Sequence, residues 1–200
     1  MIDHIEYQNL NMKFYKKLDL DHDLWSDIHR QMTQIIIEDY GIPGEIDVDR
    51  VYGCINNDLF LERVPAFKIF MSENRIEKLW IACVALTKNV RAHVDFSRGC
   101  SSYQEFQNKS LDRRLAINWP IYNVAQSETA YYETLENDAA VIRDNLLINF
   151  EENKLRKIDS FTLTEPTMLR ADLIHGMKVF NDKTRIIFST RFQQDPIHLF

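Results

Sequence analysis

A succession of short β-type segments constrains the fold of this chain most. Between residues 67 and 192, stretches rich in β-branched and aromatic residues recur at short intervals, and polar residues separate them. The expected strands are 67–71, 78–86, 90–96, 114–124, 130–133, 146–150, 157–163, 168–173, 178–180 and 185–192. Many short strands after an N-terminal helix favour a mostly β fold. We therefore expect a double-stranded β-helix, a jelly-roll core of cupin-like type, with helical support.

The supporting helix is expected over residues 24–40, directly after Asp23 as its N-cap. An apolar stripe at helical spacing marks its buried face and consists of Leu24, Ile28, Met32, Ile35 and Ile36. Gly41 and Pro43 are expected to end it. Residues 47–58 are interpreted as a solvated acidic loop. We therefore predict a single domain over residues 1–200, with helical and extended support in 1–63 and the catalytic jelly-roll core in 64–200.

Composition excludes several classes of protein. Two hundred residues with 45% hydrophobic content suffice for one domain with a substantial core. The net charge of −6 makes nucleic acid an unlikely partner, because phosphate binding requires a basic surface. Three cysteines, Cys54, Cys83 and Cys100, form no CxxC pair and predict a reducing, cytoplasmic location without a disulfide framework. The N-terminus lacks a signal-like pattern and the longest apolar run, 79–86, is too short for a bilayer, so no membrane partner is expected.

Two residues of one expected strand, His93 and Asp95, are candidate metal ligands. Side chains two positions apart in a strand point to the same face, so this imidazole and this carboxylate can approach one ion together. A third ligand would be a histidine from downstream, which leaves His175 and His198. His198 stands two residues from the end of the sequence, where fraying is expected, so His175 is the better candidate. The alternative is that these histidines make structural hydrogen bonds.

The expected strand 185–192 alternates with period two. One face carries Arg185, Ile187, Ser189 and Arg191, and the other carries Ile186, Phe188, Thr190 and Phe192. The planar guanidinium of a buried arginine suits a carboxylate ligand. The sequence therefore predicts a strand with two different faces, one of which carries both arginines.

The order of these residues resembles that of the Fe(II)- and 2-oxoglutarate-dependent oxygenases. The signature of that family is His-X-Asp, a distal histidine and a basic residue about ten positions later, and the match covers about residues 75–192. The resemblance implies Fe(II) bound by His93, Asp95 and His175, and a 2-oxoglutarate co-substrate whose far carboxylate is anchored by Arg185.

The resemblance implies further contacts with the co-substrate, but the residues concerned also have alternative roles. Asn118 lies on the strand that lines the co-substrate pocket in the family, and the alternative is a core strand whose Asn118 satisfies backbone groups. Trp119 is expected to wall the substrate side. Arg191 is expected to hold the 1-carboxylate of the co-substrate or an acid of the substrate, or else to form a surface salt bridge. The polar stretch 97–113 is interpreted as a substrate lid or a solvated loop.

The activity that the resemblance implies is a non-haem dioxygenase reaction. Dioxygen and 2-oxoglutarate would hydroxylate or desaturate a small-molecule substrate of amino-acid type or a peptide, with release of succinate and CO2. Because Asp95 is a carboxylate, where the halogenating members of the family carry a small residue, oxygen chemistry is expected in place of halogenation. The alternatives are a cupin-like metal-dependent isomerase or hydrolase and a non-enzymatic metal-binding jelly-roll protein. The sequence leaves the oligomeric state open.

Overall fold

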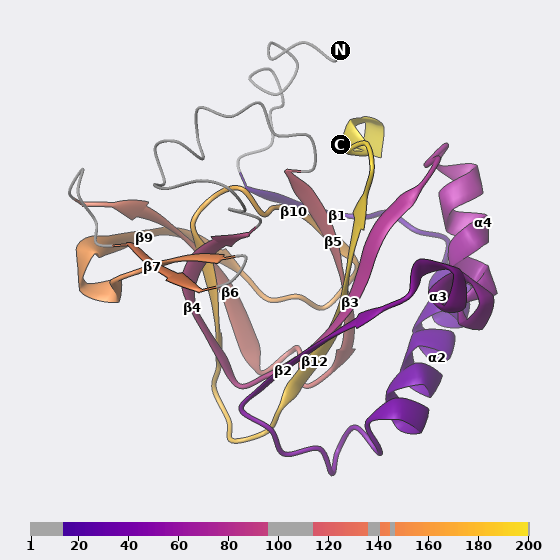
Figure 1. Cartoon of the computed structure of the whole chain (residues 1–200), viewed down its shortest axis with the longest axis horizontal. Helices are drawn as coiled ribbons and strands as arrows, with labels where there is room; N and C mark the ends of the chain where they lie inside the picture. Colours follow the sequence, from indigo (N-terminus) through magenta and orange to yellow (C-terminus); the bar gives the residue numbers. More distant parts are fainter. Residues whose placement is uncertain (1–13, 96–113, 136–140, 145–146, 200) are drawn as a thin grey trace.

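Two six-stranded antiparallel sheets form the core of the protein. The computed structural model describes residues 14–95, 114–135, 141–144 and 147–199 (Figure 1). Sheet A has the order β1 (Tyr15–Lys17), β10 (Thr167–Arg170), β5 (Leu115–Tyr122), β12 (Arg185–Phe192), β3 (Leu79–Thr87) and β2 (Arg50–Ile55). Sheet B has the order β7 (Val141–Asp144), β8 (Leu147–Phe150), β4 (Asn89–Asp95), β11 (His175–Val179), β6 (Ser127–Thr134) and β9 (Leu155–Phe161). This architecture confirms the expected jelly-roll class.

Three helices stand against sheet A and are visible on one side of the molecule in Figure 1. They are α2 (His22–Asp39), α3 (Asn57–Arg63) and α4 (Pro65–Glu73), and two short 3₁₀ turns, η1 (Glu152–Lys154) and η2 (Ile197–Leu199), complete the described elements. The cap of α2 is Asp21, whose carboxylate accepts hydrogen bonds from the backbone N–H groups of Asp23 and Leu24 at 3.0 Å. The prediction of Asp23 as the cap was therefore wrong by two residues, and Asp23 lies in the first helical turn.

An aromatic core fills the space between the helices and sheet A. Its largest fully buried side chains are Trp119, Phe60, Phe67, Phe70, Phe188 and Phe192, joined by Ile28, Met32 and Ile36 of α2. Burial of each such side chain contributes roughly 1.5–3 kcal/mol to folding. The helix-facing side of β12 is the predicted apolar one, so the period-two alternation of residues 185–192 is confirmed.

Trp119 belongs to this core and not to a substrate wall. Its indole ring contacts Phe67 and Phe70 with centroid distances of 5.4 and 5.2 Å, and its Nε1 donates to Thr190 Oγ1 at 2.9 Å. The expectation that Trp119 walls the substrate side was wrong, because residue 119 has the opposite parity to the pocket-facing Asn118 on β5.

Several other elements differ from the sequence-based expectation. Residues 67–71 are helical, because Pro65 at the first helical turn and apolar residues at helical spacing favour α4. The expected loop 47–58 contains strand β2 and the start of α3, which Asn56 caps through its side chain. Strand β7 was not expected. The predicted lid, 97–113, lies outside the described residues.

Strands from both parts of the expected domain division share one sheet. β1 and β2, from the segment expected to be support, pair with β10 and β3 at the two edges of sheet A. The division at residue 63 stays a prediction. No helix in the described ranges combines the length and the apolar character needed to cross a lipid bilayer.

Candidate metal centre

The candidate ligands come from two neighbouring strands of sheet B. His93 of β4 lies directly opposite His175 of β11, and the centroids of their rings are 4.4 Å apart. Asp95 follows two residues after His93 on the same face of β4. Its backbone N–H donates to the carbonyl of Ala171 at 3.1 Å, which ties the end of β4 to the loop before β11. Pairing of β4 with β11 thus brings His175 close to Asp95, although the two residues are 80 positions apart in the sequence.

Gly176 permits the close approach of these two strands. The register between β11 and β4 shifts between His175 and Met177, as in a β-bulge. A Cβ atom at Gly176 would lie 3.1 Å from the carbonyl oxygen of Val90 and 3.2 Å from the backbone nitrogen of Ala92. Both contacts are with backbone, which cannot rotate away, so an added methyl group would push β11 and β4 apart by a few tenths of an ångström.

The hydrogen bonds of both histidines leave the same ring nitrogen available. His93 Nδ1 lies 2.7 Å from the carbonyl oxygen of Arg91, and His175 Nδ1 lies 2.8 Å from that of Leu173. Because a carbonyl can only accept, each Nδ1 carries the proton and each Nε2 presents its lone pair. This is the arrangement of metal-ligating histidines, whose second nitrogen is fixed by a backbone carbonyl or a carboxylate.

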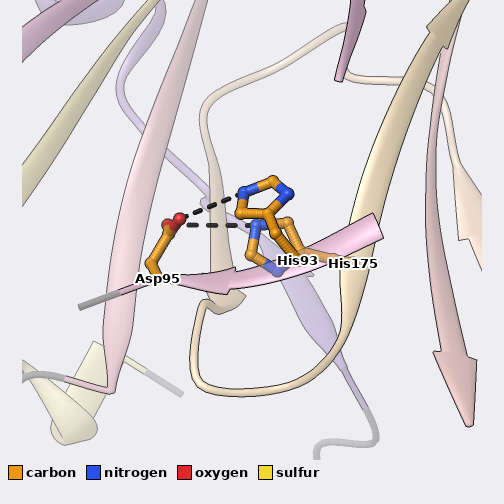
Figure 2. Close-up of side chains that lie close together, drawn as sticks. All are labelled: His93, Asp95 and His175. Carbon is orange, nitrogen blue, oxygen red and sulfur yellow. Dashed lines mark ion pairs between the residues drawn. The ribbon is translucent and has the colours of Figure 1, made fainter. Parts of the chain in front are cut away.

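The two Nε2 atoms converge on Asp95 (Figure 2). His93 Nε2 lies 3.1 Å from Asp95 Oδ1, and His175 Nε2 lies 3.9 Å from Asp95 Oδ2. The candidate ligand atoms of all three residues lie within 4.8 Å of one another. Within the described ranges, this is the one cluster of three or more such side chains. Two imidazoles and one carboxylate on one side of an ion suit non-haem Fe(II), and they leave positions open for other ligands.

Arg191 of β12 reaches Asp95 from the opposite sheet. Its Nη2 donates to Asp95 Oδ2, and the arginine side chain is only 5% exposed. Burial favours the neutral acid, but the charge of Arg191 outweighs it and holds the pKa of Asp95 well below its usual value. Asp95 is therefore an anion throughout the physiological range. The alternative given for Arg191, a salt bridge at the surface, was wrong in its location: Arg191 does form a salt bridge, but its side chain is buried in the pocket wall.

Burial also keeps His175 neutral. It lowers the pKa of this imidazole to about 4, and the neighbouring His93 acts in the same direction. A neutral imidazole is the form that binds a metal ion.

Arg185 stands in the same pocket at the other end of β12. It is 4% exposed, and its Nε and Nη2 atoms have no hydrogen-bond partner in the described part of the chain. Burial lowers its pKa to about 10, which leaves the guanidinium charged at neutral pH. An unpartnered buried cation is costly unless a ligand compensates it. The arrangement therefore fits an anionic ligand.

The pocket is a cavity of about 360 Å³ between the two sheets. The cavity is lined by the three candidate ligands His93, Asp95 and His175, called the triad below, and by Arg185 and Arg191. Asn118 also lines it, and its buried Oδ1 lacks a hydrogen-bond partner among the described residues. A cavity of this volume admits a small dicarboxylate.

Strand β2 contributes a wall of the pocket that the sequence-based interpretation missed. Arg50, Tyr52 and Cys54 share one face of β2 and line the cavity. Residues 47–58 were interpreted as a loop because of their acidic residues. The period-two spacing of these three side chains was the signal that a strand was present.

Comparison with known proteins supports the fold. Neither a protein-family model nor a curated protein matches the chain. Among solved structures, the epimerase SnoN, in complex with Fe3+, alpha-ketoglutarate and nogalamycin RO, is 11% identical with a TM-score of 0.55 over 89% of this chain and 78% of that chain. The chain has the fold of the 2-oxoglutarate-dependent oxygenases. The alpha-ketoglutarate-dependent carbocyclase SnoK matches this oxygenase fold over 96% of this chain and 84% of its own, with 8% identity and a TM-score of 0.53.

A third structure with the oxygenase fold is HygX from Streptomyces hygroscopicus, with nickel and 2-oxoglutarate bound. It is 10% identical, with a TM-score of 0.53 over 97% of this chain and 88% of that chain. At these identities the likeness establishes the fold. The assignment of ligands to this chain rests on its own residues.

Proposed function

We propose that this protein is a non-haem Fe(II)- and 2-oxoglutarate-dependent oxygenase. One observation carries the proposal: a convergent His-Asp-His group and an unpartnered buried guanidinium line the same cavity. A metal ion would balance the negative charge of Asp95 in the first group, and a carboxylate would balance the positive charge of Arg185. The fold shared with SnoN, SnoK and HygX supports this pairing of ligands.

The proposed roles follow from the side chains. His93 and His175 bind Fe(II) through Nε2, and Asp95 binds it through a carboxylate oxygen. Bound iron and 2-oxoglutarate would supply the activation of dioxygen, with succinate and CO2 as co-products. Arg185 holds the far carboxylate of 2-oxoglutarate with its Nε and Nη2 donors.

Asn118 and Arg191 complete the proposed co-substrate site. The amide of Asn118 faces the cavity and has a free acceptor, Oδ1, while its nitrogen can donate to the oxoacid. Arg191 keeps Asp95 ionised and lies close enough to the metal position to meet the 1-carboxylate of a chelating oxoacid.

For the prime substrate we propose a compact molecule of amino-acid type or a peptide side chain, which is hydroxylated. A compact substrate is compatible with a cavity of about 360 Å³ that also has to hold 2-oxoglutarate. SnoN is an epimerase and SnoK a carbocyclase, so this fold serves several oxidative outcomes. A cytoplasmic location and a single domain complete the proposal.

Two alternative functions do not require Arg185 to bind an oxoacid. A cupin-like isomerase or hydrolase would use the triad without an oxoacid, and a non-enzymatic binding protein would need neither. Neither alternative explains why an arginine with unpartnered donors is buried in the metal pocket.

Succinate formation separates these functions. Protein loaded anaerobically with Fe(II) and 2-oxoglutarate is mixed with oxygenated buffer, and succinate is measured over time. The proposed function predicts succinate above the metal-free control, even without prime substrate, and little succinate from Arg185→Ala. Arg30→Ala is a matched control because Arg30 is an exposed helical arginine. Succinate equal in loaded and metal-free protein would exclude an oxygenase of this kind.

A further inference from the structure

Two cysteines lie side by side in the wall of the pocket. Cys54 of β2 is directly opposite Cys83 of β3, and their Sγ atoms are 2.8 Å apart. Both side chains line the cavity that holds the metal site. Cys83 is in turn directly opposite Ser189 of β12, so Cys54, Cys83 and Ser189 form one row across three neighbouring strands. On β12, Ser189 lies between Arg185 and Arg191.

The backbone around this pair suits a covalent bond. Directly opposite residues of antiparallel strands have Cα atoms about 4.5–5.5 Å apart, which lies within the range that disulfides span. Both thiols are free in this structure, and the two strands are already paired along six successive positions, from Arg50 to Ile55 on β2. A bond between them therefore needs no rearrangement of the sheet.

The two thiols differ in their access to solvent. Cys54 is exposed, whereas Cys83 is partly buried beneath it. Burial, together with its contact to Cys54, raises the pKa of the Cys83 thiol. A soluble oxidant therefore meets Cys54 first, and Cys83 is the neighbour placed to react second.

We propose that Cys54 and Cys83 form a reversible disulfide when the protein meets a hydroperoxide, so that the pocket wall is a redox modification site. Cys54 attacks the peroxide O–O bond, which yields a sulfenic acid and releases water or an alcohol. The Cys83 sulfur then displaces hydroxide from that sulfenic acid, its proton leaves as part of a second water, and the S–S bond forms. Two thiols lose two hydrogens and two electrons in total, and the hydroperoxide is reduced by the same two electrons.

The bond would fix the edge of the pocket. β2 is the edge strand of sheet A, and the segment between the two cysteines contains α3, α4 and the start of β3. Closing this loop covalently restricts the unfolded chain, so the oxidised protein should unfold at a temperature roughly 5–10 °C higher. The proposal is independent of the proposed oxygenase function, because it requires only the two thiols and an added peroxide.

The test treats the metal-free chain of 200 residues with equimolar hydrogen peroxide, alkylates the remaining thiols and maps the peptides by mass spectrometry. The proposal predicts a loss of about 2 Da and one cross-linked peptide pair containing Cys54 and Cys83, both reversed by dithiothreitol. The thermal midpoint should rise with oxidation and fall again with reduction. Sulfinic acid at Cys54 with Cys83 still alkylated, or pairing of either cysteine with Cys100, would overturn it.

Three variants make the assignment specific. Cys100→Ser should keep the cross-link and its thermal shift, whereas Cys83→Ser and Cys54→Ser should lose both. The peptide map of the parent protein decides the proposal by itself, so the test still holds if one of the variants folds poorly. A peroxide-induced thermal shift of equal size in Cys83→Ser would also contradict the proposal.

Discussion

Arg191 of sheet A, which is buried, forms an ion pair with the partly buried Asp95 of sheet B, across the cavity between the two sheets. The carboxylate of Asp95 thus faces two imidazoles on one side and a guanidinium on another. The site holds Asp95 as an anion before any metal arrives. A metal ion would add a second cation to the same carboxylate.

This ion pair predicts a metal-dependent stability effect. In the metal-free protein, Arg191→Met should lower the free energy of unfolding by about 3–5 kcal/mol, because Asp95 is left as a buried charge with reduced compensation. A bound divalent ion compensates that charge, so the loss should be smaller with saturating Mn²⁺ as a redox-inert substitute. Urea denaturation of parent and variant with and without Mn²⁺ measures both values. Equal losses in the two conditions would mean that Asp95 does not bind the ion.

Arg185 should control the affinity for 2-oxoglutarate alone. A charge-assisted bidentate pair in a buried pocket is worth on the order of 2–4 kcal/mol, so Arg185→Ala should weaken 2-oxoglutarate binding by roughly thirty- to a thousandfold. Fe(II) binding should change little. Anaerobic calorimetry on the iron-loaded protein provides the comparison, with Arg30→Ala as the control. If Arg185→Ala binds 2-oxoglutarate like the parent, the anchor lies elsewhere and Arg191 is the next residue to test.

Gly176 should be required for the metal site. In Gly176→Ala the new Cβ meets the backbone of Val90 and Ala92 at 3.1–3.3 Å, so β4 and β11 must separate slightly. We expect a loss of roughly 1–3 kcal/mol in stability and weaker metal binding, since the two imidazoles move apart. Gly44→Ala is a matched control because its Cβ would meet Tyr122 at an ordinary 3.5 Å. Unchanged metal affinity in Gly176→Ala would show that the bulge does not position His175.

The presence of Asp95 also predicts the type of product. With a carboxylate in the ligand set, no position is vacated for chloride, and the product should gain oxygen or lose hydrogen. Mass spectrometry of the product formed in abundant chloride, once a prime substrate is found, makes this check. A product with chlorine in place of hydrogen would mean that Asp95 is not a metal ligand.

Local patterns predicted the two strands that carry most of the site. Strand parity placed His93 beside Asp95 and sorted β12 into a core face and a pocket face, because both properties depend only on the alternation of side chains along a strand. His175 was preferred to His198 because His198 stands two residues from the end of the sequence, where fraying was expected. In the structure, His198 contacts the backbone carbonyl of Asn74, away from the triad.

Features that depend on pairing between distant segments were not predictable from local patterns. The bulge at Gly176 exists only because β11 pairs with β4, and the Arg191–Asp95 pair joins two sheets. The apolar run 67–71 is too short to distinguish a strand from a buried helix turn, and the packing of its aromatic residues against Trp119 decides for the helix. Cys54 and Cys83 meet only through the pairing of β2 with β3.

The most direct test of the metal site is the Fe(II) stoichiometry of the parent protein and two histidine variants. His175→Ala removes a proposed ligand, whereas His22→Ala removes an exposed histidine at the start of α2 and serves as the control. Loss of a direct ligand should cost more than the roughly 10–100-fold in affinity that loss of an outer-shell partner costs. Under anaerobic conditions we expect one equivalent of Fe(II) in the parent and in His22→Ala, and little or none in a folded His175→Ala. One equivalent in His175→Ala, bound as tightly as in the parent, would contradict the assignment of His93, Asp95 and His175 as the metal site.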